Sequence, residues 1–173
     1  MRLLKLFTRP FAMLYAKIYP SSYAKLIGVK INGNIKIYGS ALEMFSTEPF
    51  CITLGDNVHI TNGVKFLTHD GGTLLFRDKF PTLDITKKIE VGNNVYIGIN
   101  SIIMPGVTIN DNTIIGAGSV VTKSFPSGSV VAGTPAKYIK SFDEYLEKIN
   151  VESTELGHLI GNKKKEELKK YFT

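Results

Sequence analysis

The chain has 173 residues, 43% of them hydrophobic, and a formal net charge of +6. This length and apolar content suffice for one domain with a real core and exclude an intrinsically disordered chain. The single cysteine, Cys51, cannot form an intrachain disulfide, and the absence of a CxxC pair argues against a redox motif or a cysteine-based zinc site, so we expect a reducing, cytoplasmic environment.

The first thirty residues are apolar and basic. The stretch MRLLKLFTRPFAMLYAKIYP is interrupted by Lys5, Arg9 and Lys17 and carries Pro10 in its middle. No uncharged run approaches the ~20 residues that a membrane span needs, and no long uncharged core of a secretion signal is present. We predict a basic amphipathic helical segment over residues 1–30, which either caps the domain, the interpretation we prefer, or makes peripheral contact with a membrane face.

The middle of the chain repeats with a period of six. A weak start lies over residues 31–42, hexads follow over residues 54–71, and seven more run without a gap over residues 85–126. The first positions of these seven are all β-branched and aliphatic: Ile85, Val91, Ile97, Ile103, Ile109, Ile115 and Val121. A period of six fits neither an α-helix nor a plain strand, but it fits a short strand plus a turn.

This pattern predicts an all-β solenoid. The β-branched residues would point inward and pack on their counterparts in neighbouring coils, and the Gly and Asn residues between them would supply the left-handed backbone of sharp corners. The hexads and the late string IGAGSVVTKSFPSGSVVAGTPAKYIK, residues 115–140, resemble the hexapeptide-repeat acyltransferases. That resemblance implies a left-handed parallel β-helix over residues 31–140, three hexads to each triangular coil, and a homotrimer whose donor groove lies between two subunits.

The hexads stop once. After FLTHDG, thirteen residues (72–84) have no place in a repeating wall, so we predict an extruded loop there. The loop carries apolar side chains that a neighbouring subunit or a ligand would cover: Leu74, Leu75, Phe76 and Phe80. In the tail, residues 141–173, Phe142, Tyr145 and Ile149 have helical spacing, which predicts a helix that docks on the β-helix.

His69 lies at the mouth of the predicted loop. The local string THDGG followed by FR is similar to polysaccharide O-acetyltransferases of the same family, in which a histidine before such a loop is the catalytic base. The resemblance implies that His69 takes the proton of a sugar hydroxyl as its oxygen attacks the thioester of acetyl-CoA. The alternative is a polar residue that merely ends a repeat.

The group that would orient His69 is left open by the sequence. In a strand, the side chain of the adjacent Asp70 would point to the opposite face, which leaves Glu43, Asp84 or a backbone carbonyl. The other two histidines, His59 and His158, are expected to be structural and solvated respectively, so we predict no metal site.

The resemblance also implies where acetyl-CoA binds. An oxyanion donor would come from the backbone around Gly98 and Ile99. The remaining contacts would come from Ala117, Thr122, Lys123, Lys137 and Lys140. The family often has arginine at the last two positions; lysine keeps the positive charge but loses bidentate phosphate geometry.

The function we expect is acetyl transfer from acetyl-CoA to a hydroxyl of a sugar or polysaccharide precursor, at the inner face of the membrane if the basic segment binds there. The alternatives are an N-acetyltransferase acting on an amino sugar or another small acceptor, and a non-catalytic β-helix scaffold. No nucleic-acid partner is expected, because the basic run over residues 161–172 lacks interleaved aromatic residues. The sequence does not identify the acceptor.

Overall fold

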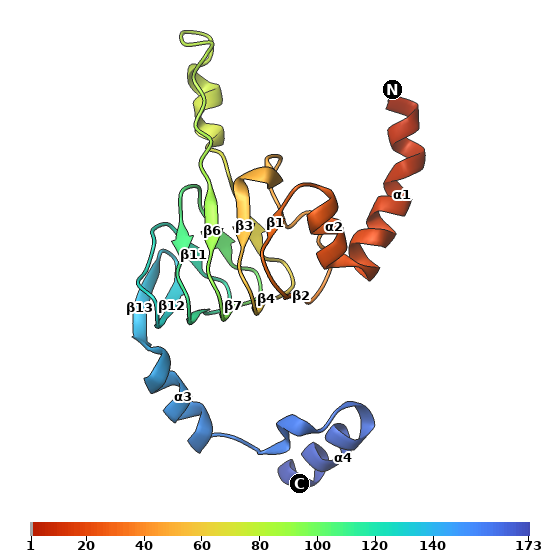
Figure 1. The fold of residues 1–173 in the computed structure, drawn as a ribbon, viewed down its shortest axis with the longest axis vertical. Helices are drawn as coiled ribbons and strands as arrows, with labels where there is room; N and C mark the ends of the chain where they lie inside the picture. The colour runs from red at the N-terminus through yellow and green to blue at the C-terminus, as the bar shows by residue number, and fades with distance from the viewer. Residues whose placement is uncertain (1) are drawn as a thin grey trace. The chain divides into compact units, whose positions relative to one another are not determined.

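The computed structural model describes the backbone of residues 2–173 and the side chains from Arg9 onward. The chain forms two compact units, Met1–Phe142 and Asp143–Thr173. The first unit begins with α1 (Arg2–Ile18) and α2 (Pro20–Leu26), within the predicted N-terminal helical segment, and continues as a stack of three-sided coils (Figure 1).

Each complete coil contributes one short strand to each of three sheets, as the period of six predicts. The first sheet contains β1 (Lys30–Ile31), β3 (Ile52–Leu54), β6 (Ile89–Val91) and β9 (Thr108–Ile109). The second contains β2 (Ile35–Ile37), β4 (Val58–Ile60), β7 (Val95–Ile97), β10 (Thr113–Ile115), β12 (Ser129–Gly133) and β13 (Ala136–Ser141). The third contains β5 (Lys65–Phe66), β8 (Ile102–Ile103) and β11 (Val120–Val121). The strand pairs are parallel except β12 with β13, which is antiparallel.

The core lies inside the coils. Six of the seven first-position residues are at most 4% exposed: Val91, Ile97, Ile103, Ile109, Ile115 and Val121. The fifth-position residues, such as Val95 and Ser101, are also buried. Like residues therefore stack on like residues from coil to coil, as predicted, and the apolar interior stabilises the stack.

Asparagines form the corner between the first and second sheets. Asn57, Asn94 and Asn112 have φ values of 52°, 53° and 54°, the left-handed region that Asn tolerates better than most residues. Their side-chain amides form a ladder, Asn57 Nδ2 to Asn94 Oδ1 at 2.9 Å and Asn94 Nδ2 to Asn112 Oδ1 at 3.1 Å. The corner residues thus both turn the chain and tie successive coils together.

Ile85 departs from the predicted pattern. Its side chain is 38% exposed, and the chain returns to the wall only at β6, where Ile89 and Val91 are buried. The excursion from the wall is therefore longer than residues 72–84: it starts near Thr68, where the backbone pairs with Lys87, and Figure 1 shows it projecting from one edge of the coil. Because Ile85 and Val91 are six residues apart, spacing alone could not distinguish the end of the excursion from the first residue back in the wall.

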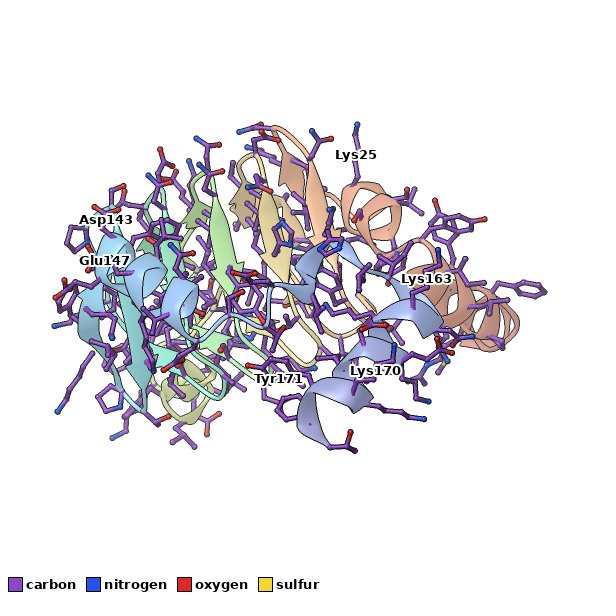
Figure 2. The ribbon with its side chains drawn as sticks, turned by 90° about the horizontal axis from the view of Figure 1, so that it is seen from below. Lys25, Asp143, Glu147, Lys163, Lys170 and Tyr171 are labelled. Atoms are coloured by element: carbon purple, nitrogen blue, oxygen red, sulfur yellow. The ribbon has the colours of Figure 1, made fainter. Side chains whose placement is uncertain are left out.

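The second unit is helical. It contains most of α3 (Phe142–Val151), a 3₁₀ helix, η3 (Leu156–His158), and α4 (Gly161–Phe172). Figure 2 labels Asp143 and Glu147 on α3, and Lys163, Lys170 and Tyr171 on α4. The helix predicted after Ser141 is present, and its docking on the coil stays a prediction. Over the described residues, every helix is too short or too polar to cross a bilayer.

Candidate functional site

A carboxylate from the preceding coil meets His69. The segment before the 3₁₀ helix η1 (Pro49–Cys51) runs parallel to β5, because Phe45 bridges to Phe66 and the Ser46 N–H donates to the Phe66 carbonyl at 3.1 Å. Continuing this register by three residues places Glu48 beside His69. The distance from His69 Nδ1 to Glu48 Oε2 is 2.8 Å.

Two threonine hydroxyls hold Glu48 in its ionised form. Thr47 Oγ1 donates to Glu48 Oε1, and Thr68 Oγ1 donates to Glu48 Oε2 at 2.6 Å. These bonds, with that of Thr47 as the largest influence, lower the pKa of Glu48 from 4.5 to about 2; His69 adds to the lowering and burial opposes it. At neutral pH Glu48 can therefore only accept a hydrogen bond, so the proton of a neutral His69 lies on Nδ1.

The other nitrogen of His69 is then the unprotonated one. The side chain of His69 is 40% exposed, and no described residue forms a hydrogen bond with Nε2. An exposed imidazole with one nitrogen anchored by a carboxylate and the other unprotonated is the arrangement of a general base.

The structure resolves the alternatives that the sequence left open for this anchor. The suggestion that Glu43 or Asp84 orients His69 was wrong. Glu43 Oε2 lies 3.4 Å from Lys65 Nζ, and Asp84 Oδ1 lies 3.0 Å from Arg77 Nη2. Asp70 points elsewhere, as predicted: its carboxylate accepts from the Gly72 N–H at 2.9 Å and caps the 3₁₀ helix η2 (Gly71–Phe76).

Sequence reasoning missed Glu48 because the coils before β5 are not regular. Later coils pair at an interval of 18 residues, as in Val95 with Thr113. Phe45 and Phe66, however, are 21 residues apart. An interval of 18 would have placed Cys51, not Glu48, beside His69.

The base of the excursion fixes the backbone on the other side of His69. His69 forms an isolated antiparallel bridge with Thr86, the Asp70 N–H donates to the Ile85 carbonyl at 3.0 Å, and the Lys87 N–H donates to the Thr68 carbonyl at 2.7 Å. Beyond this stem, the apolar residues predicted to need a cover are 55–83% exposed: Leu74, Leu75, Phe76 and Phe80. The backbone beside His69 is therefore paired, while the apolar side chains beyond it in the excursion are uncovered.

Three of the predicted cofactor residues follow one corner, between the second and third sheets. The Gly118 N–H donates to the Ile99 carbonyl at 2.7 Å, so Ala117 comes directly after Ile99 along the stack. Lys137 pairs with Ala132, in the strand that follows β10. Ile99, Ala117 and Lys137 are all exposed, so an extended ligand lying along this corner would meet them in that order.

Gly98 has a packing role at the same corner. Its N–H donates to the Ile115 carbonyl at 2.8 Å, and a Cβ atom on it would lie 2.5 Å from the Ala117 nitrogen, so the close approach of the two coils requires glycine. The Gly98 N–H is thus already used. Among the described residues of this corner, neither the N–H of Ile99 nor that of Ala117 has an acceptor, so both are available as donors to a ligand.

The other predicted cofactor residues lie elsewhere in the chain. Thr122 and Lys123 follow β11 and occupy the corner between the third and first sheets, the corner at which His69 follows β5; Lys123 Nζ lies 5.6 Å from the centre of the Phe125 ring. Lys140 pairs with Val130, near the start of β12. Within one chain, the third sheet separates Thr122 and Lys123 from Ile99 and Ala117, and Lys140 lies toward the opposite end of β12 from that corner.

The other histidines have local partners. His59 lies on the outer side of β4, with Nδ1 2.9 Å from the Tyr38 hydroxyl and Nε2 3.1 Å from Asn57 Oδ1. His158 belongs to the second unit, where Nδ1 lies 3.1 Å from the Glu155 carbonyl oxygen. Within residues 2–173, no three His, Cys, Asp or Glu side chains group closely enough to hold a metal ion.

Known proteins share this sequence pattern. A family model described as bacterial transferase hexapeptide (six repeats) matches residues 88–123. Protein CapG of Staphylococcus aureus is 46% identical over 139 residues, which cover 80% of this chain and 81% of that protein. Galactoside O-acetyltransferase of Escherichia coli (strain K12) is 38% identical over 112 residues, 62% of this chain and 55% of that protein, so the chain spans about half the length of this second relative.

Solved structures share the architecture. A galactoside acetyltransferase in complex with coenzyme A matches with a TM-score of 0.52 and 26% identity, over 73% of this chain and 72% of that one. A hexapeptide-repeat containing acetyltransferase from Vibrio cholerae O1 biovar eltor, complexed with acetyl-CoA, has a TM-score of 0.53 at 23% identity, over 77% of this chain and 84% of that one, a likeness of fold. With the match to CapG over most of both chains, these findings confirm the predicted family: the chain belongs to the hexapeptide-repeat acyltransferases and is an acyltransferase.

Proposed function

We propose that the protein transfers the acetyl group of acetyl-CoA to a hydroxyl of a sugar or a polysaccharide precursor. The observation that carries this proposal is the pair formed by His69 Nδ1 and the carboxylate of Glu48 at 2.8 Å, which leaves Nε2 of the 40% exposed side chain free for an acceptor hydroxyl. The galactoside O-acetyltransferase among the relatives supports a sugar hydroxyl as acceptor, and the structure bound to coenzyme A supports acetyl-CoA as donor.

In the proposed reaction, Nε2 of His69 takes the proton of the acceptor hydroxyl as its oxygen attacks the thioester carbonyl. The new C–O bond forms, and the tetrahedral intermediate then collapses by breaking the C–S bond. The departing CoA sulfur receives the proton from the imidazolium, so His69 returns to its starting state. Glu48 stabilises the transient imidazolium, and the Ile99 N–H would donate to the oxyanion.

The separation of the two corners within one chain favours a site shared by two subunits. We propose the homotrimer and the left-handed coil that the family resemblance implies. The corner with Ile99, Ala117 and Lys137 on one subunit would then face His69 on its neighbour. The pantetheine arm would follow that corner, while Lys123 and Lys140 would meet the phosphates together with Lys137. The exposed apolar residues of the excursion would cover the groove or contact the adjacent subunit.

The test is His69→Ala in an assay with acetyl-CoA and a panel of free sugars, nucleotide sugars and lipid-linked sugars, with products identified by mass spectrometry. Turnover should fall by about 10²–10⁴, the usual contribution of a general base. His59→Ala is the matched control and should retain wild-type turnover, because the His59 ring lies on the outer side of β4 and hydrogen-bonds Tyr38 and Asn57, away from His69. Unchanged turnover in His69→Ala would refute the mechanism.

The panel and a binding measurement separate the remaining alternatives. Acetylation of an amine in place of a hydroxyl would point to the N-acetyltransferase. A scaffold would show neither turnover nor a rise in melting temperature with CoA, whereas a ligand bound only by the folded state raises it.

A further inference from the structure

The first thirty residues carry the whole charge imbalance of the protein. They contain six basic residues and no acidic residue: Arg2, Lys5, Arg9, Lys17, Lys25 and Lys30. The chain as a whole has 21 Lys and Arg against 15 Asp and Glu, so residues 31–173 hold 15 of each sign. The positive charge is therefore concentrated on α1, α2 and the start of β1.

α1 carries an exposed apolar stripe, which borders the coil only at Leu14. Ala16, on one side of the helix, is fully buried, and its carbonyl accepts from the Ala41 N–H at 3.1 Å. On the opposite side Phe11, Leu14 and Ile18 share one face, spaced by three and four residues, and are 76%, 57% and 54% exposed. A helix that simply covers a coil in water would carry polar side chains on this outer face.

The adjoining helix, α2, also exposes basic and apolar side chains. In α2, Ala24 is fully buried, and Ser21 Oγ donates to the Ile35 carbonyl at 3.3 Å, so this helix caps the open end of the coil. Its outer residues include Lys25, which points away from the coil in Figure 2, and Leu26, which is 73% exposed. Capping the coil thus leaves a basic and apolar outer surface exposed.

A groove of about 850 Å³ lies between α1 and the coil. Met13, Leu14 and Leu42 supply its apolar lining, and Lys17 lies with Ser40 and Asn62 in its polar lining. A cation and neutral donors next to exposed aliphatic side chains suit a phosphate group that carries acyl chains.

We propose that α1 and α2 bind the surface of a membrane that contains anionic phospholipid. Basic residues near such a surface are attracted electrostatically, and the apolar stripe would enter the boundary between headgroups and acyl chains. A second copy of the chain is disfavoured as the occupant, because its segment carries the same positive charge. Nucleic acid is disfavoured because its phosphate backbone would leave the aliphatic side chains of Leu14, Ile18 and Leu26 uncovered.

Vesicle flotation tests this proposal without any enzymatic readout, so it stands or falls separately from the proposed function. The full chain is mixed with vesicles of phosphatidylcholine alone or with added phosphatidylglycerol. We expect flotation with the anionic vesicles only, and less of it at higher salt. Lys17→Glu should weaken the binding by roughly tenfold, since each basic residue near an anionic surface adds to the attraction.

The apolar stripe is tested with Leu14→Ser/Ile18→Ser, which should abolish flotation while circular dichroism and the melting temperature stay as in the wild type. Matched controls are Val151→Ser, which removes a side chain that is 88% exposed on α3, and Lys163→Glu on α4; both should float like the wild type. Failure of the wild type to float, or full flotation of Leu14→Ser/Ile18→Ser, overturns the proposal. One further result would overturn the proposal: the wild type does not float, and Leu14→Ser/Ile18→Ser has a different oligomeric mass from the wild type. The stripe would then be a contact between copies of the chain.

Discussion

At His69, the proposed chemistry depends on a carboxylate from another coil. Glu48 accepts from Thr68 and is 2.8 Å from His69 Nδ1. An acceptor on one nitrogen sets the tautomer and the ring orientation, and a carboxylate also stabilises the imidazolium that forms in the reaction. In the proposed reaction Glu48 is thus a positioning residue, acting on the acceptor only through His69.

Glu48→Gln tests this role. The amide keeps the size of the side chain but lacks the charge, so kcat should fall by about 10- to 100-fold, part of the 10²–10⁴ that a general base contributes, with KM little changed. Glu43→Gln is the matched control, because the Glu43 carboxylate pairs with Lys65 and not with His69. An equal effect of both substitutions on kcat would contradict the positioning role.

The lowered pKa of Glu48 also predicts how stability depends on pH. Its pKa is about 2 in the folded protein, below the ordinary value of 4.5. A group with a lowered pKa stabilises the folded state above its unfolded-state pKa, and that contribution is lost as the pH falls through the folded-state value. Urea unfolding between pH 4.5 and 2 should therefore show a smaller loss of stability in Glu48→Gln than in the wild type. Parallel pH curves for the two proteins would show that Glu48 is not held ionised in the folded state.

In the coil, the burial of a residue, and not its position in the repeat, decides how much its side chain contributes to the free energy of unfolding. Ile85 and Ile103 hold the same hexad position, yet Ile103 is fully buried and Ile85 is 38% exposed. Ile103→Ala should lower the free energy of unfolding by about 2–5 kcal/mol, whereas Ile85→Ala should cost within about 1 kcal/mol. Chemical denaturation of both variants checks this, and equal losses would place Ile85 in the wall after all.

The asparagine ladder makes a second prediction for the coil. Asn94 has φ 53°, and its side-chain amide forms two hydrogen bonds, with Asn57 and with Asn112. Alanine loses both bonds and also resists this backbone conformation, which costs roughly 1–2 kcal/mol; glycine loses only the bonds. Asn94→Gly should therefore be more stable than Asn94→Ala by about 1 kcal/mol in the same measurement. The reverse order would mean that the backbone conformation is not the limiting factor at this corner.

For the whole molecule, the question is whether one chain holds a complete site. His69 and the corner of Ile99 and Ala117 flank the third sheet from opposite ends of its strands. In the proposed trimer, each site takes its base from one subunit and its cofactor groove from the next. Sedimentation should accordingly give three times the chain mass of 19.1 kDa.

Complementation tests the shared site directly. His69→Ala removes the base, and Ala117→Trp would fill the proposed path of the pantetheine arm from an exposed position. Each variant alone should be inactive, but trimers refolded from an equal mixture should regain about a quarter of the wild-type activity, the statistical share of sites formed from two intact halves. No recovery in demonstrably mixed trimers would mean that the site lies within one chain.

The sequence alone determined the repeating architecture, the inward positions of the late hexads and the asparagine corners, because each depends on residues within a few positions of one another. It also singled out His69, whose place before the excursion is visible in the order of the chain. Only the tertiary structure decided that Glu48 faces His69, that Ile85 lies outside the wall and that Gly98 uses its N–H in packing. These outcomes depend on the register between coils, and irregular segments change that register by a few residues that no local pattern reveals.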